Sequence, residues 1–122
     1  MGAKILLVDD DPDISSLLQG ELETKGYEVK VCDSGEEVLG TLQAYRPDLL
    51  IMDVMLPGVD GYSLTNNIGD SEALRNIPII IMSALSTSRS MFEPIPQVHA
   101  FFSKPFSPEE FMESVAAALA KK

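Results

Sequence analysis

Short apolar runs alternate along the whole chain with segments in which apolar residues recur every three to four positions. The apolar runs predict five strands, at residues 4–8, 27–31, 49–52, 79–82 and 100–102. The segments between them have the periodicity of amphipathic helices. Strands that alternate with helices are typical of βα units around a parallel sheet, so the pattern predicts an α/β domain whose sheet is covered on both faces.

The expected helices have recognisable ends. The first has Pro12 at its first position and stops before Gly26. Its predicted apolar stripe comprises Ile14, Leu17, Leu18 and Leu22. Ser34 and Ser107 each precede a glutamate by three residues, which is the capping box that starts a helix. A weaker helix after the turn-like PGVDG at residues 57–61 is expected to be interrupted near Gly69.

The segment between the last two strands has the poorest helix signal. Residues 84–99 are rich in Ser and Thr and contain Pro94 and Pro96. Because proline disfavours helical backbone at the residue before it, a helix here is expected to be short or irregular and to end by residue 92 or 93.

The charge balance restricts the partners of this chain. The 122 residues include 19 Asp and Glu but only 9 Lys and Arg, which gives a net charge of -10. Scattered basic residues argue against direct binding of nucleic acid. An acidic surface favours a basic partner or a divalent cation, although it also serves solubility alone.

Length and cysteine content predict one domain in a reducing compartment. A chain of 122 residues, expected to be a single domain over residues 1–122, buries a core without disulfides or structural metals. Cys32 is the single cysteine and is expected in or near the core. Because no apolar run approaches the length of a membrane span, we expect a cytoplasmic protein without membrane contact.

Polar residues whose side chains can bind ligands or take part in a reaction follow four of the predicted strands. Asp9 and Asp10 follow the first strand, Asp53 the third and Ser83 the fourth, and Lys104 comes two residues after the fifth. In an open parallel sheet the carboxyl ends of the strands converge on one edge. Each residue alone has an ordinary reading as a cap, a turn residue or a surface lysine, but together they predict a site with three carboxylates, a hydroxyl and an ammonium.

Two other interpretations of the acidic run fit less well. Asp9, Asp11 and Asp13 have EF-hand spacing, but Ile14 stands in place of the loop glycine and Gly20 in place of the final glutamate. A haloacid-dehalogenase type phosphohydrolase also begins with a strand ending in D-x-D, yet it wants Thr or Val where this chain has Asp13. The calcium loop is excluded, and the phosphohydrolase stays as a weaker alternative.

Four sequence blocks carry a resemblance to a known family. They are VDDD at residues 8–11, MDVMLPGVDG at 52–61, MSA at 82–84 and SKPF at 103–106. Over roughly residues 4–118 the chain resembles a receiver domain of two-component response regulators. The resemblance implies a flavodoxin-like (βα)5 fold, a doubly wound five-stranded parallel sheet with strand order 2-1-3-4-5.

The resemblance also implies the chemistry of the site. Asp53 is similar to the aspartate that accepts a phosphoryl group from a phosphohistidine. Asp10 and Asp53 are similar to direct Mg²⁺ ligands, together with the backbone carbonyl of Met55, while Asp9 is expected to act through water. Mn²⁺ is expected to substitute for Mg²⁺. Hard oxygen donors and charge compensation are what phosphoryl transfer asks of a protein.

Three further positions match residues that respond to phosphorylation. Ser83 matches the hydroxyl that binds a phosphoryl oxygen, Lys104 the paired ammonium and Phe101 the aromatic switch. The implied function is a signalling switch that promotes its own phosphorylation and dephosphorylation without being a conventional turnover enzyme. Expected partners are a sensor histidine kinase or a His-containing phosphotransfer protein, and an unknown output protein or domain. A phosphorylation-independent interaction module on the same fold remains an alternative.

Some positions depart from the family pattern or carry no polar group. Met55 and Leu85 lie two residues after Asp53 and Ser83, where receivers tune dephosphorylation. Both side chains are apolar and cannot orient a water, so we expect a long-lived phosphoryl group. The lead EPIPQVHAF into the last strand predicts a modified output face, and His99 is expected to be structural rather than a relay residue.

Overall fold

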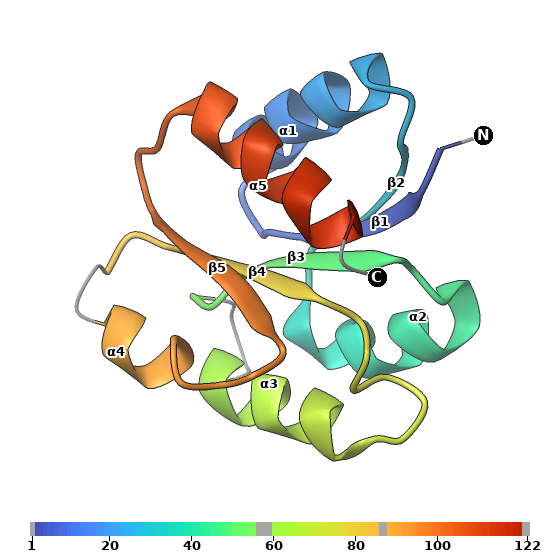
Figure 1. Cartoon of the computed structure of the whole chain (residues 1–122), viewed down its shortest axis with the longest axis vertical. Coiled ribbons are helices and arrows are strands. Elements are labelled where there is room, and N and C mark those ends of the chain that lie inside the picture. Colours follow the sequence, from blue (N-terminus) through green and yellow to red (C-terminus); the bar gives the residue numbers. More distant parts are fainter. Residues whose placement is uncertain (1, 56–59, 86–87, 121–122) are drawn as a thin grey trace.

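The computed structural model describes residues 2–55, 60–85 and 88–120. Its five strands are all parallel, and they form one sheet in the order β2-β1-β3-β4-β5 (Figure 1). The strands are β1 Lys4–Val8, β2 Glu28–Cys32, β3 Leu49–Asp53, β4 Ile79–Ser83 and β5 Val98–Ser103. The predicted doubly wound fold and its strand order are therefore confirmed.

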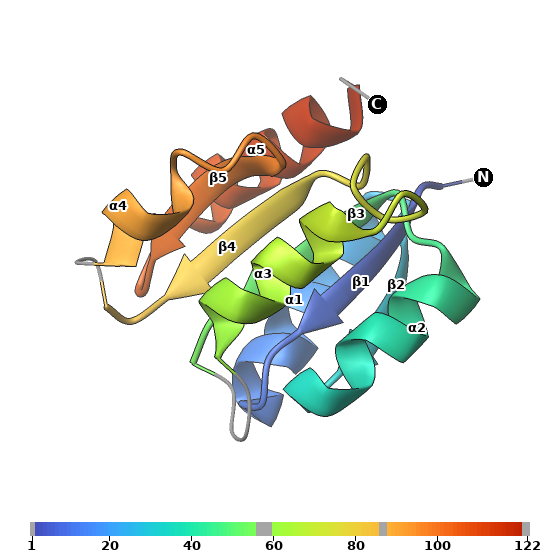
Figure 2. The same cartoon turned by 90° about the horizontal axis from the view of Figure 1, so that it is seen from below.

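Helices cover both faces of the sheet. Those in the described residues are α1 Pro12–Thr24, α2 Val38–Tyr45, α3 Gly61–Asp70, α4 Arg89–Phe92 and α5 Pro108–Ala120, with a 3₁₀ turn η1 at Gly35–Glu37. Figure 2 shows α2, α3 and α4 on one side of the sheet, and α1 and α5 lie on the other. None of these helices is long and apolar enough to cross a membrane.

The core consists of two apolar layers separated by the sheet. Strands β1, β3 and β4 are central and almost wholly buried, which explains their continuous runs of aliphatic residues. Alternate side chains of each strand enter opposite layers. One layer joins Leu50 and Ile81 to Leu42 and Ile68, and the other joins Ile51 to Leu22 and Phe111. Burying each large side chain contributes about 1.5–3 kcal/mol.

Side-chain caps fix where several helices begin. The Asp11 carboxylate accepts a hydrogen bond from the backbone N–H of Asp13 at the start of α1, and Asp60 does the same for Tyr62 at the start of α3. Ser107 accepts from the N–H of Glu110, as its predicted capping role requires. Caps of this kind are typically worth about 1 kcal/mol.

The predicted start of the second helix needs a correction. The Ser34 hydroxyl accepts from the N–H of Glu36 rather than from Glu37. The first turn is therefore the 3₁₀ turn η1, and α2 follows it at Val38. A 3₁₀ turn at a helix start is common, because its tighter hydrogen bonds satisfy groups that the α-helix leaves unpaired.

One expectation about the apolar stripe of α1 was wrong. Leu17 is 61% exposed, because α1 turns Ser15, Leu18 and Leu22 toward the sheet. The spacing alone allowed either Leu17 or Leu18, since both lie three or four residues from Ile14. Helix α3 ends at Asp70, one residue after Gly69, in agreement with the expected interruption near Gly69.

Strand ends and the last connection also differ in detail from the expectation. Strand β2 begins and ends one residue later than expected, so that Cys32 is its buried last residue. Strand β5 is longer than residues 100–102, and its pairing skips His99, because Ile79 pairs with Val98 and Ile80 pairs with Ala100. The expected short fourth helix is confirmed, since α4 ends at Phe92. The turn at 57–61 falls mostly outside the described residues.

Candidate functional site

Three carboxylates meet where strands β1 and β3 end. Asp9 and Asp10 directly follow β1, and Asp53 is the last residue of β3. Each of these three residues offers an oxygen, and the oxygens all lie within 4.8 Å of one another. Asp9 and Asp53 are buried, whereas Asp10 is exposed. The predicted convergence of carboxylates at one edge of the sheet is thus present.

Backbone N–H groups hold the two buried carboxylates in place. The N–H of Asp11 donates to Asp9 Oδ1 at 2.9 Å, and the N–H of Met55 donates to Asp53 Oδ1 at 2.8 Å. In both cases the donor lies two residues along the chain, which is the local turn that Asp favours after a strand. Each carboxylate therefore has one oxygen fixed by its own loop and a second oxygen available for other partners.

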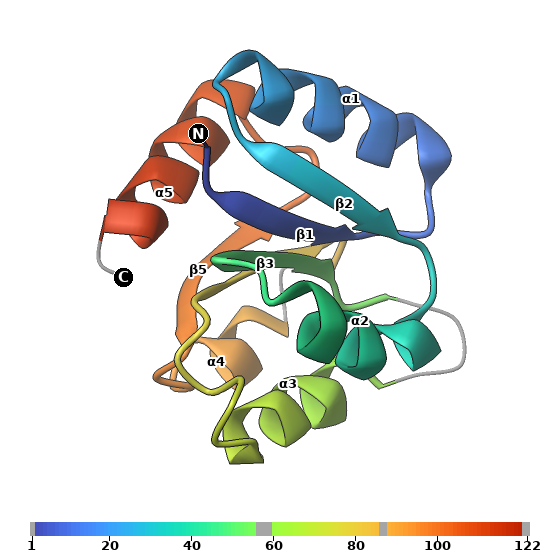
Figure 3. The same ribbon diagram turned by 90° about the vertical axis from the view of Figure 1, so that its right-hand side faces the viewer.

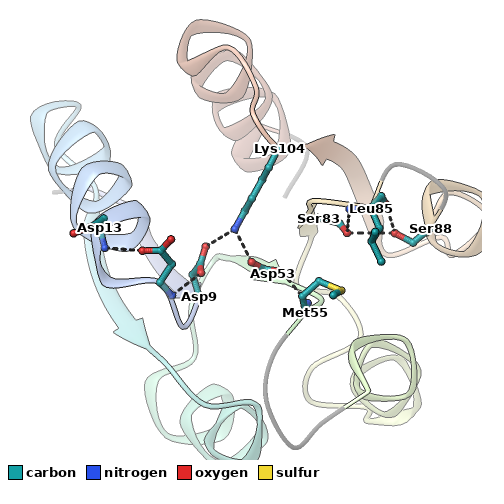
Figure 4. A network of polar contacts seen from close by, with 9 residues as sticks. Asp9, Asp13, Asp53, Met55, Ser83, Leu85, Ser88 and Lys104 are labelled. Carbon is teal, nitrogen blue, oxygen red and sulfur yellow. Dashed lines mark hydrogen bonds and ion pairs between the residues drawn. The ribbon is translucent and has the colours of Figure 1, made fainter.

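Lys104 bridges the two buried carboxylates. Its Nζ lies 2.6 Å from Asp53 Oδ2 and 3.0 Å from Asp9 Oδ2 (Figure 4). Its backbone N–H donates to the carbonyl of Ser83 at 2.8 Å, which ties the loop after β5 to the end of β4. Charge-assisted hydrogen bonds of this length are the strong ones in proteins.

Burial and pairing act against each other on these charges. Burial raises the pKa of the Asp9 carboxyl above its ordinary value, although hydrogen bonds from Asp11 and Lys104 oppose the rise. For Lys104, burial lowers the pKa of the ammonium, but the hydrogen bonds and charges of Asp53 and Asp9 outweigh it and the pKa is raised. Lys104 therefore stays charged at neutral pH.

Ser83 is the last residue of the neighbouring strand β4, but its hydroxyl forms its hydrogen bonds outside the carboxylate cluster. The side chain is fully buried, and its Oγ accepts a hydrogen bond from the N–H of Leu85 at 2.9 Å. Ser88 Oγ lies 3.4 Å away. Figure 4 shows this group on the side of Leu85 and Ser88, apart from the contact between Lys104 and Asp53. The sequence did not predict the contact with Ser88.

A family model for the response regulator receiver domain matches residues 5–116. The chain belongs to the receiver domain family.

Relatives of this receiver domain include regulators of two lengths. The alkaline phosphatase synthesis transcriptional regulatory protein PhoP of Bacillus subtilis is 35% identical over 98% of this chain, which spans 49% of PhoP. The polar-differentiation response regulator DivK of Brucella ovis is 34% identical, with 98% of both chains covered. The chain thus spans about half the length of PhoP and nearly all of DivK.

Solved structures agree with the fold and include a magnesium complex. A putative response regulator from Chloroflexus aurantiacus superposes with a TM-score of 0.91 at 32% identity, covering 98% of this chain and 99% of its own. The response regulator TrrA from Thermotoga maritima, solved in complex with Mg²⁺-BeF, has a TM-score of 0.84 at 32% identity, covering 97% and 99%.

The donor set of this receiver domain fits a divalent cation. Asp9, Asp10 and Asp53 supply hard carboxylate oxygens, and three carboxylates against the one ammonium of Lys104 leave excess negative charge. Mg²⁺ prefers such oxygens, and it needs only one or two carboxylates because it keeps several waters. The exposure of Asp10 leaves an approach from solvent.

The expected aromatic switch residue of the receiver domain lies in the core. Phe101 is buried next to Phe92, with ring centroids 6.2 Å apart. The Arg89 guanidinium covers the Phe101 ring, with its carbon 4.9 Å from the centroid. Phe101 thus connects β5 with α4.

Two apolar side chains lie in the loops that follow Asp53 and Ser83. Met55 is 52% exposed and Leu85 is 50% exposed, although both are large and hydrophobic. They follow Asp53 and Ser83 by two residues, so that neither offers a polar atom in its side chain beside the site. Their exposure confirms that they are surface positions rather than members of the core.

Proposed function

We propose that this receiver domain is a phosphorylation-activated switch in which Asp53 accepts the phosphoryl group. The observation that carries the proposal is the direct contact between Asp53 Oδ2 and the Lys104 ammonium, inside a cluster of three carboxylates. The proposed nucleophile thus has one fixed positive charge beside it and possible ligands for a second. Phosphoryl transfer depends mainly on positioning and on compensation of charge.

The proposed donor is a phosphohistidine on a sensor histidine kinase or a His-containing phosphotransfer protein. An Asp53 oxygen attacks the phosphorus while the bond from phosphorus to the imidazole nitrogen breaks, and that nitrogen keeps the electron pair. Because the second ring nitrogen of the phosphohistidine carries a proton when the bond breaks, the products are an acyl phosphate on Asp53 and a neutral imidazole. When bound, Mg²⁺ neutralises charge on the phosphoryl oxygens. Lys104 pairs with one of these oxygens in place of its present contact with Asp53.

The metal is proposed to bind Asp10, Asp53 and the backbone carbonyl of Met55, with Asp9 acting through water. Asp9 also holds Lys104 at 3.0 Å, so it fixes the ammonium beside the nucleophile. Ser83 is proposed to donate its hydroxyl to a further phosphoryl oxygen. Each role depends on the charges and the geometry at this one edge of the sheet, where the strands end.

Phosphorylation is proposed to change the surface around α4 and β5. A phosphoryl group adds about -1.5 to -2 charge where three carboxylates already lie. Added repulsion of this kind shifts an element between two arrangements rather than deforming a packed core gradually. The short α4 carries Arg89, which covers the ring of Phe101, so it is the element proposed to change, and it offers an unusual face to a partner.

Acetyl phosphate with Mg²⁺ tests this function, with Asp53→Asn as the control. The proposal expects intact-mass analysis to find one phosphoryl group on the wild type and none on Asp53→Asn or in EDTA. Rapid release of phosphate without a stable adduct indicates the small phosphohydrolase instead. Absence of labelling in both proteins indicates an interaction module that works without phosphorylation.

A further inference from the structure

The hydroxyl groups of Ser83 and Ser88 contact each other beyond the end of β4. Ser88 Oγ lies 2.7 Å from the carbonyl oxygen of Leu85 and 3.4 Å from Ser83 Oγ. The Ser88 hydroxyl is the donor in both contacts, so its single proton is shared between the carbonyl oxygen of Leu85 and Ser83 Oγ. Ser83 Oγ thus accepts from the N–H of Leu85 and from the hydroxyl of Ser88, and the two contacts hold it beside the loop that follows β4.

This arrangement holds the hydroxyl that the proposed function needs elsewhere. Ser83 is 0% exposed, and the described residues show no contact of its hydroxyl with the side chains of Asp53 or Lys104. To donate to a phosphoryl oxygen on Asp53, the Ser83 hydroxyl has to leave Ser88. At 3.4 Å the contact is longer than an ordinary hydroxyl hydrogen bond, so a charged phosphoryl oxygen is the stronger partner for the Ser83 hydroxyl.

We propose that Ser88 is a positioning residue that holds the Ser83 hydroxyl away from Asp53 in the unphosphorylated domain. Binding of a phosphoryl group then competes with the contact between Ser83 and Ser88. The proposal rests on the proposed function of Asp53 and Ser83, and it assigns to Ser88 a role in setting how readily the site is occupied.

The position of Ser88 extends this competition to the switch surface. Ser88 directly precedes α4, whose first residue is Arg89. The Arg89 guanidinium covers the ring of Phe101, and Phe101 packs against Phe92 at the end of the same helix. Release of Ser83 from Ser88 therefore frees the start of α4 at the point where it covers the aromatic residue of β5.

Beryllofluoride with Mg²⁺ serves as the phosphoryl probe, measured by isothermal titration calorimetry. Ser88→Ala is expected to bind it roughly two- to tenfold more tightly than the wild type, the range for loss of one competing hydrogen bond. Ser88→Thr keeps the hydroxyl and is expected to match the wild type. Ser90→Ala is the matched control, because Ser90 lies exposed on the same short helix. Unchanged or weaker binding by Ser88→Ala overturns the proposal.

A double-mutant cycle separates this role from a merely structural one. If Ser88 acts through Ser83, adding Ser88→Ala to Ser83→Ala changes the beryllofluoride affinity no further. An equal gain in both backgrounds shows that Ser88 acts only by shaping the loop, and it overturns the proposal.

Amide exchange of the free protein keeps the proposal testable if the proposed function fails. Failure of the wild type to bind beryllofluoride contradicts the proposed function. In that case, Ser88→Ala is still expected to speed hydrogen exchange of the Leu85 amide, whose acceptor is Ser83 Oγ. Ser90→Ala is expected to leave that rate unchanged. Equal Leu85 exchange rates in the wild type and Ser88→Ala overturn the contact itself.

Discussion

Asp9 shows at the scale of one residue how burial sets the cost of a charge. Its folded-state pKa lies above the ordinary value of 3.8, with burial as the largest cause. A raised pKa means that the contribution of Asp9 to stability is fully present below pH 3.8 and is lost as the pH rises through the folded pKa. At neutral pH without metal, the ionised Asp9 therefore lowers the free energy of unfolding.

Asp9→Asn is accordingly expected to raise the free energy of unfolding at pH 7 in EDTA, because the amide removes the buried charge and still accepts from Asp11. Urea unfolding measures the change, and the difference from the wild type is expected to shrink toward pH 3.8. Asp13→Asn, at an exposed position of the first turn of α1, is the control. A destabilised Asp9→Asn at pH 7 contradicts the sign of this argument.

At the residue scale, the side chain of Met55 is also expected to affect the lifetime of the phosphoryl group on Asp53. Its exposed thioether side chain cannot orient a water for attack on the acyl phosphate. Met55→Asn introduces an amide at this place and is expected to shorten the lifetime several-fold, which phosphate release after removal of acetyl phosphate measures. Leu17→Asn replaces another exposed apolar residue, on α1, and is expected to change nothing. Equal lifetimes for Met55→Asn and the wild type contradict the prediction.

At the scale of elements, two glycines at different helix positions have opposite roles. A Cβ on Gly20 in α1 meets no atom within 4 Å, whereas a Cβ on Gly61 at the start of α3 lies 2.8 Å from Val54 Cα. Gly20 only adds conformational freedom to the unfolded chain. Gly61 allows α3 to approach the backbone that follows β3 and Asp53.

Gly20→Ala is expected to stabilise the protein by about 0.5–1 kcal/mol, since alanine restricts the unfolded chain at no steric cost. Gly61→Ala is expected to destabilise it by about 1–3 kcal/mol through overpacking against the backbone. Urea unfolding of the two matched variants gives both values. Equal effects of the two substitutions exclude a steric role for Gly61.

At the scale of the whole molecule, the excess negative charge is spread over the chain, but a bound cation can compensate it at one place. The net charge is -10, and the structure places three of the carboxylates within reach of a single cation. Unspecific screening acts on all charges, whereas a bound ion acts only where its ligands converge. The two effects therefore differ in their dependence on Asp10.

Mg²⁺ is expected to raise the stability of the wild type beyond the effect of potassium chloride at equal ionic strength. Binding to the folded state alone contributes about 2.7 kcal/mol at a metal concentration 100 times the dissociation constant. Asp10→Ala removes an exposed ligand and is expected to abolish this excess, while Asp13→Ala retains it. Thermal unfolding in both salts decides the matter, and equal stabilisation by the two salts contradicts a specific site.

The sequence by itself predicted the five strands, the short α4 and the convergence of three carboxylates at one edge of the sheet, while the family resemblance supplied the strand order. These features depend on local patterns: apolar runs, helix periodicity, prolines and the polar residues after each strand. Only the tertiary structure decided that Leu17 is exposed, because this depends on which face of α1 meets the sheet. The sequence also left open the bridge from Lys104 to two carboxylates and the contact between Ser83 and Ser88. Distances between side chains on separate loops follow from packing, which no local pattern encodes.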